Sequence, residues 1–193
     1  MRIQRQEQLE ALTSPPRQEI VSTLESAGTL AVAELAELLG RAPDSLYYHL
    51  RKLRQVGLVV EKGSRMAGRR REVLYGLPAE KIRLHFDPDN PANVDATSRA
   101  VSAMLRLADR SIRAGMENGR AVIRGEDKNA SAGRVKAWLA PEAMGEVLEL
   151  LGKLVEILER NRAGNEGQLC SFTYVLTPES GTQAPPKEED VSP

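Results

Sequence analysis

Two short apolar helical patterns, separated by only three residues, constrain the fold of this chain more than any other feature. The first spans residues 32–39 and ends at Gly40; the second, over 43–56, opens at Pro43, a residue suited to the first turn of a helix. At the spacing of one helix face, the first carries Val32, Leu35, Ala36 and Leu39. The second carries Leu46, Leu50 and Leu53 in the same way. Two short helices joined by such a turn predict a helix-turn-helix.

The segments on either side extend this pattern into a larger unit. We expect a helix before it, beginning near Ser14, whose side chain can cap the first turn, and ending at Gly28. After it, the apolar run 58–61 and the segment 70–77 predict the two strands of a β-hairpin, and the Gly- and Arg-rich stretch 62–68 predicts a loose basic tip. Three helices followed by a basic hairpin are the order of a winged helix.

The formal net charge of zero conceals an uneven distribution. Residues 1–84 hold 14 Lys and Arg against 10 Asp and Glu, so the rest of the chain holds 13 against 17. Within 41–71, nine basic residues stand against two acidic ones, a local net charge of +7. Such a segment favours a polyanionic partner such as nucleic acid, although a solvated basic face needs no partner at all.

Three stretches of this unit occur in the order and spacing of a known family. Residues 12–21 (LTSPPRQEIV), 32–40 (VAELAELLG) and 45–59 (SLYYHLRKLRQVGLV) resemble the opening helix, the second helix, and the recognition helix with wing entry of ArsR-type winged-helix regulators. The resemblance covers roughly 12–78. Members of that family are typically dimeric transcription factors, often repressors, and the resemblance implies that fold and that role here.

The chain departs from the family at two helix starts and at the metal ligands. Ala31 and Ala42 stand where such proteins often have a capping Ser or Thr, at a cost of about 1 kcal/mol each. Metal-sensing members carry paired Cys on the recognition helix, or His and carboxylates on a long dimer helix. The recognition helix here has no Cys and the helix expected near 97–118 has no His, so a metal sensor of those types is disfavoured and no cofactor is expected.

The predicted DNA contacts lie on the outer face of the 43–56 helix and on the hairpin. A helix of this width fits the major groove, and arginines are favoured on the backbone or in the minor groove. The expected groove contacts are Ser45, Tyr47, Tyr48, Arg51 and Lys52, and the expected contacts of a basic wing over 62–71 are Arg65, Arg69, Arg70 and Arg71. Alternatively, these arginines only keep the hairpin edge soluble. Asp44 is expected to balance the helix dipole, and His49 to be partly buried with its hydrogen bonds satisfied.

The C-terminal half predicts a second, smaller unit after a Pro-, Asn- and Asp-rich linker over 85–95. Its first helix carries an apolar stripe that either packs within the chain or forms a dimer seam. That stripe comprises Val101, Met104, Leu105, Ala108 and Ile112. Strands over 134–139 and 169–176 flank a helix that opens at Pro141 and turns its apolar face inward, which predicts a small α+β domain. The Pro- and Glu-rich segment 178–193 is expected to be a disordered tail.

No motif in this half indicates catalysis. It has no Gly-rich phosphate loop, no nucleophile elbow and no His pair at metal-ligand spacing, so we expect no enzyme. The single cysteine, Cys170, is expected to be a buried, inert thiol. Neither a secretory signal nor an apolar run of roughly 20 residues is evident, which favours a cytoplasmic protein without a membrane partner. Five further side chains form either core or the lining of an apolar effector pocket: Met104, Met116, Trp138, Phe172 and Tyr174.

Together these patterns predict an α+β protein. Its expected parts are a winged helix-turn-helix DNA-binding domain over 1–84, the linker 85–95, an α+β dimerisation or effector domain over 96–177 with two longer helices, and the tail 178–193. The predicted function is a homodimeric, sequence-specific transcriptional regulator that binds double-stranded DNA. The alternative is a winged helix that binds another protein within a larger assembly, which would need an apolar, weakly charged recognition face.

Overall fold

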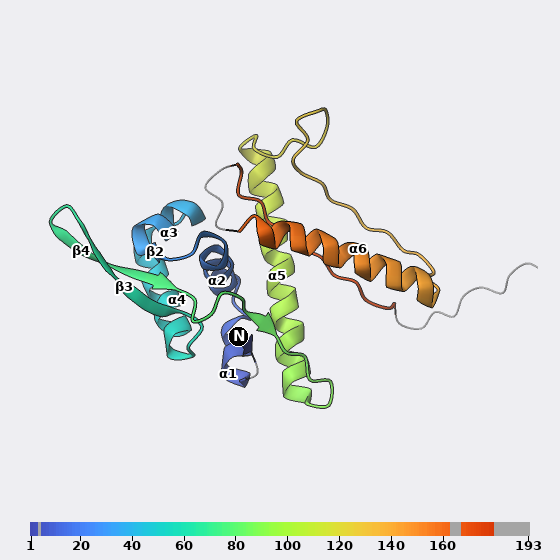
Figure 1. Ribbon diagram of the computed structural model, residues 1–193, viewed down its shortest axis with the longest axis horizontal. Helices are drawn as coiled ribbons and strands as arrows, with labels where there is room; N and C mark the ends of the chain where they lie inside the picture. The colour runs from blue at the N-terminus through green and yellow to red at the C-terminus, as the bar shows by residue number, and fades with distance from the viewer. Residues whose placement is uncertain (4, 163–166, 180–193) are drawn as a thin grey trace, which may run out of the picture.

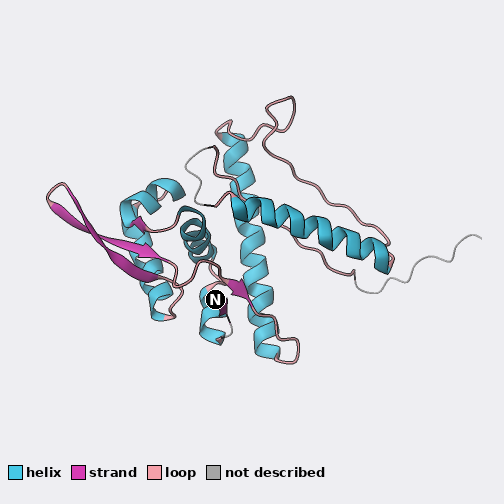
Figure 2. Ribbon diagram, viewed as in Figure 1, coloured by secondary structure: helices cyan, strands magenta, loops and turns pink. Residues whose placement is uncertain are grey.

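The computed structural model describes residues 1–3, 5–162 and 167–179. This part of the chain contains six helices and five strands, shown in Figure 1 and by type in Figure 2. In chain order they are β1 (Arg2–Ile3), α1 (Gln6–Ala11), α2 (Pro15–Ala27), β2 (Leu30–Ala31), α3 (Val32–Leu39), α4 (Pro43–Gln55), β3 (Val60–Ala67), β4 (Arg70–Gly76), β5 (Arg83–Leu84), α5 (Pro91–Glu117) and α6 (Pro141–Arg160).

The predicted pair of helices is confirmed: α3 and α4 occupy the expected segments. Gly40, which ends α3, has φ of 59°, a left-handed conformation that glycine adopts without a steric penalty. Helix α2 begins as predicted, with Ser14 at the N-cap position and Pro15 in the first turn, but the expected capping hydrogen bond is wrong because the Ser14 side chain makes none. At the start of α3 the Ala31 amide donates to the carboxylate of Glu34 over 2.8 Å. This is the half of a capping box that the glutamate provides, so one backbone N–H at the start of the helix is satisfied although Ala31 has no capping side chain.

The β-hairpin is longer than predicted. The stretch expected to be a loose tip, 62–68, belongs mostly to β3, which pairs with β4 in an antiparallel ladder from Val60↔Gly76 to Ala67↔Arg70. Only a tight turn separates the strands, and Gly68 reaches it with φ of 61°. Strand β2 pairs with the inner part of β4 to complete a three-stranded sheet of order β2-β4-β3. The outer part of the hairpin therefore projects beyond the body of the domain (Figure 1).

One hydrophobic core lies beneath α4 and joins the N-terminal helices to the sheet. Leu46, Leu50 and Leu53 of α4 are essentially inaccessible to solvent, as predicted from their spacing. Burial of each such side chain stabilises the fold by roughly 1.5–3 kcal/mol. The other fully buried large side chains of this core are Ile3, Leu9, Ile20, Leu24, Leu35, Leu58 and Val59. The position of α4 is thus fixed along its whole inner face.

Helix α5 begins earlier than expected, inside the segment predicted to be a linker. The Asn90 side chain accepts hydrogen bonds from the amides of Ala92 and Asn93 and starts the helix at Pro91. Small residues then let α5 approach α1 and α2 closely; the buried ones are Ala96, Ala100 and Ala103. Gln18 of α2 donates to the Ala100 carbonyl over 2.8 Å. The first half of α5 is therefore part of the same packed body as the helix-turn-helix.

The C-terminal part differs from the prediction in three respects. The segments 134–139 and 169–176 are extended but form no strand, so within the described ranges the sheet content ends at β5. Helix α6 has no buried residue, although its apolar face was expected to point inward. Cys170 is exposed rather than buried, because its segment does not pair into the expected sheet. From residue 180 onward, the predicted tail lies outside the described residues.

Candidate nucleic-acid interface

The outer face of α4 presents the predicted groove contacts together. Tyr47 and Tyr48 are 54% and 50% exposed, which is unusual for large aromatic side chains without a partner. The guanidinium carbon of Arg51 lies 5.9 Å from the centre of the Tyr48 ring, within reach of a cation–π contact. Lys52 is exposed beside them. Ser45 is exposed at the first turn, although its hydroxyl donates to the Ala42 carbonyl over 2.7 Å.

A shallow hollow beside this face contains contacts that sequence reasoning missed. Arg54 forms an ion pair of 2.7 Å with Glu61 of β3, and its guanidinium carbon lies 5.9 Å from the centre of the Tyr75 ring. Burial raises the pKa of the Tyr75 hydroxyl above its usual range. The hollow is lined by Tyr47, Tyr48, Leu50, Arg51, Arg54 and Tyr75. These contacts link α4 to β4, so the helix and the hairpin present one continuous surface.

The four predicted hairpin arginines fall into two groups. Arg65 is held by the carboxylates of Glu34 at 2.8 Å and Glu72 at 3.4 Å, which anchors the hairpin to α3. The Ala31 amide, followed by Arg65, lowers the pKa of the Glu34 carboxyl. Arg71 donates to the Ser64 hydroxyl over 2.8 Å. Arg69 lies in the turn and Arg70 begins β4, and their side chains have no hydrogen-bond or ion-pair partner within the described residues.

His49 differs from its prediction in one respect. It is half-buried, as expected from its position at the flank of the α4 core face. Its Nδ1 atom, however, is buried and has no hydrogen-bond partner among the described residues, so the expectation of a satisfied histidine is wrong. Burial, with the nearby charges of Arg17 and Arg41, lowers the pKa of the imidazole. Asp44 is exposed in the first turn of α4, the position where a carboxylate complements the helix dipole.

The predicted dimer stripe is partly covered in the single chain. Val101, Met104, Ala108 and Ile112 are half-buried and Leu105 is exposed. The buried side chains of α5 are instead Asn93, Ala96, Ala100 and Ala103. Of the stripe, only Leu105 is therefore open to a partner without rearrangement.

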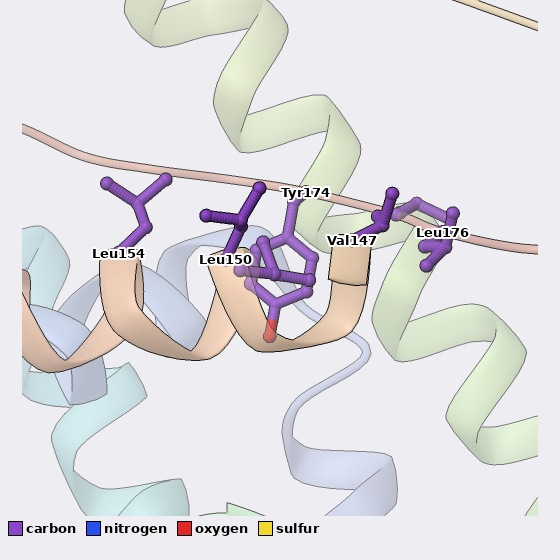
Figure 3. A pocket seen from close by; sticks show the side chains of 7 residues that line it. Val147, Leu150, Leu154, Tyr174 and Leu176 are labelled. Atoms are coloured by element: carbon purple, nitrogen blue, oxygen red, sulfur yellow. The ribbon is translucent and has the colours of Figure 1, made fainter. Parts of the chain in front are cut away.

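The five side chains considered for an effector pocket do not converge. Trp138, Met116 and Phe172 are all exposed. Only Tyr174 of that set lines an apolar groove, which lies between α6 and the extended segment 174–176 (Figure 3). The remaining lining comes from α6: Val147, Leu150, Leu151 and Leu154. The predicted pocket is therefore wrong in its composition, because only Tyr174 of the five residues lines this groove.

No group of three or more His, Cys, Asp or Glu side chains in the described ranges is placed to hold a metal ion. None of the helices of these ranges combines the length and apolar character needed to cross a membrane. Comparison with curated proteins finds no match. Residues 12–62, which contain α2, α3, α4 and the start of β3, match the family model of a helix-turn-helix domain.

Proposed function

We propose that this protein is a homodimeric, sequence-specific DNA-binding regulator of transcription, of the ArsR-like winged-helix type. The observation that carries the proposal is the outer face of α4, where Tyr47, Tyr48, Arg51 and Lys52 are exposed together on the second helix of a matched helix-turn-helix. A repressor role rests on the family resemblance alone. The proposal assigns no catalytic role to the chain and places it in the cytoplasm, in contact with DNA.

In this proposal α4 enters the major groove and the hairpin acts as the wing. Arg51 is the residue suited to bidentate hydrogen bonds with guanine, whereas the tyrosines contact phosphate or thymine methyl groups. Arg69 and Arg70 lie where the wing reaches the backbone or the minor groove, and their charges are not neutralised by carboxylates of the described residues. Arg65 instead holds the wing in place through Glu34.

Two copies bind two half-sites about one turn of DNA apart, because a single helix reads only a few base pairs. The α5 stripe, whose Leu105 is 48% exposed in the single chain, supports a role in holding the two copies together. The competing proposal, a winged helix that binds another protein, requires an apolar and weakly charged face. Arg51, Lys52 and the turn arginines disfavour it.

Selection from a pool of random DNA duplexes tests the proposal. We expect the wild-type chain to enrich a partly palindromic motif. Arg51→Ala should lose preference at one position in each half-site, with a cost of about 1–3 kcal/mol against the preferred base. Arg106→Ala, an exposed arginine on α5, is the matched control and should select the unchanged motif. Enrichment of no motif by the wild-type chain would overturn the proposal.

A further inference from the structure

Helix α6 has an apolar half that the described chain covers only in part. At 100° per residue, its apolar side chains occupy roughly half of the circumference, and its charged side chains occupy the other half. A helix with so wide an apolar face normally buries it. Here no residue of α6 is buried, and Leu150, near its middle, is 57% exposed. The helix contacts the body through its C-terminal end, where Glu159 forms ion pairs with Lys81 and Arg83.

The segments before and after α6 have backbone groups without hydrogen-bond partners among the described residues. Both are extended, and both alternate in the way that favours a β-strand, yet neither makes a backbone–backbone hydrogen bond to a described residue over 131–139 or 168–176. Apolar side chains along them face solvent: Val135 is 90% and Trp138 60% exposed. An open edge with apolar side chains is a template for pairing with another strand.

Side-chain contacts show that these two segments run in the same direction along α6. The Asn129 amide donates to the Gln168 side-chain oxygen over 3.1 Å, near the start of each segment. Further along, Arg134 and Lys136 both form ion pairs of 3.1 Å with Glu179. Figure 1 shows α6 between them, running the opposite way. The chain thus has the order and direction of a strand–helix–strand unit. Among the described residues, however, the two extended segments do not pair with any strand.

We propose that this unit, residues 129–179, is completed by a second copy of the same chain. The extended segments of the two copies pair into one sheet, and the apolar halves of the two α6 helices cover it. The inference rests on the homodimer of the proposed function and names a second interface for it, separate from the α5 stripe. The groove between α6 and residues 174–176 in Figure 3 is then filled by apolar side chains of the second copy.

The size of the apolar surface fits a dimer contact. Trp138, Phe172 and Tyr174 each carry roughly 150–250 Å² of surface, of which about half is exposed. The leucines of α6, among them Leu148 and Leu150 at 53% and 57% exposed, add to this apolar surface, and each partner of a stable complex buries ~800 Å².

The distribution of charge favours an identical partner. Glu149 and Glu156 of α6 lie on its charged half, whereas Glu146, one turn before Leu150, borders the apolar half. Two apolar halves can therefore meet around a two-fold axis without bringing the charged halves together, which a self-complementary contact requires. In a sheet made of two copies, each extended segment of one copy can pair with an extended segment of the other.

Light scattering on full-length variants tests the inference. We expect the wild-type chain to have twice the mass of one chain, 21.2 kDa, at micromolar concentration. Leu150→Glu with Leu154→Glu should reduce it to one chain or raise the dimer dissociation constant at least a hundredfold. The matched control, Glu149→Gln with Glu156→Gln on the polar half, should stay dimeric. Thermal unfolding checks that the variant is still folded, as expected from the exposure of both leucines.

Amide hydrogen exchange gives an independent readout that needs no variant. In the wild-type dimer we expect slow exchange over 134–139 and 169–176, and fast exchange would overturn the strand pairing. A monomeric wild-type chain, or an α6 variant that stays dimeric while Leu105→Glu on the α5 stripe dissociates, would overturn the inference. Because DNA selection is measured separately, a dimer that enriches no motif refutes only the proposed function.

Discussion

Replacement of the two arginines at the hairpin turn tests how the hairpin contributes to DNA binding. Arg69 and Arg70 are exposed and unpaired among the described residues, whereas Arg65 is held by two carboxylates. Each phosphate contact contributes about 0.9 to the slope of log Kobs against log salt concentration. If both arginines contact phosphates, Arg69→Ala with Arg70→Ala should reduce that slope by about 2 per chain, or about 4 for a dimer. The loss of affinity should be similar on specific and non-specific DNA.

Fluorescence anisotropy titrations at several salt concentrations measure this slope. Arg106→Ala is the matched control, because it removes one exposed positive charge from α5, a helix that lies apart from the hairpin (Figure 1). Arg65→Ala should change the slope less than the double variant, since Glu34 and Glu72 already neutralise its charge. An unchanged slope in the double variant, or an equal decrease in Arg106→Ala, would refute the reasoning.

Three further predictions concern the stability of the unit that carries the interface. Gly40→Ala should lower the free energy of unfolding by about 1 kcal/mol in urea titrations, because φ of 59° strains a residue with a Cβ; a stability equal to wild type would contradict this. Glu34→Ala should cost a similar ~1 kcal/mol, since the Ala31 amide and Arg65 both lose a partner, and should speed hydrogen exchange in the hairpin more than elsewhere. For His49, the unfolded pKa of about 6.5 exceeds the lowered folded value, so its contribution to stability is complete above pH ~6.5 and is lost as pH falls through the folded pKa. His49→Gln should flatten the change of unfolding free energy between pH 7 and 5, and an unchanged pH profile would show that this imidazole does not contribute.

Local patterns predicted the helices because the forces that set them act within a turn or two. The spacing of Leu46, Leu50 and Leu53 decided which face of α4 is buried, and the same spacing placed Tyr48 and Arg51 outside. The part of the candidate interface that lies on the outer face of α4 could therefore be predicted from the sequence.

Features that depend on partners far along the chain were not readable in this way. The hairpin was predicted too short because Ser64 and Arg65 gain their strand conformation from Val73 and Glu72 across the ladder, not from their neighbours. The anchoring of Arg65 by Glu34 has no spacing signal, since it joins β3 to α3. The alternation over 134–139 predicted a strand wrongly, because a strand needs a hydrogen-bonding partner and the described residues provide none for this segment.

The spacing of the two half-sites gives the most direct test of the central claim, that two copies of this chain read DNA through α4. The measurement compares affinity for the selected palindromic motif with affinity for the same motif carrying five inserted base pairs between the half-sites. Because the insertion rotates one half-site by about half a turn, we predict affinity close to that for non-specific DNA. Equal affinity for both duplexes would contradict the account.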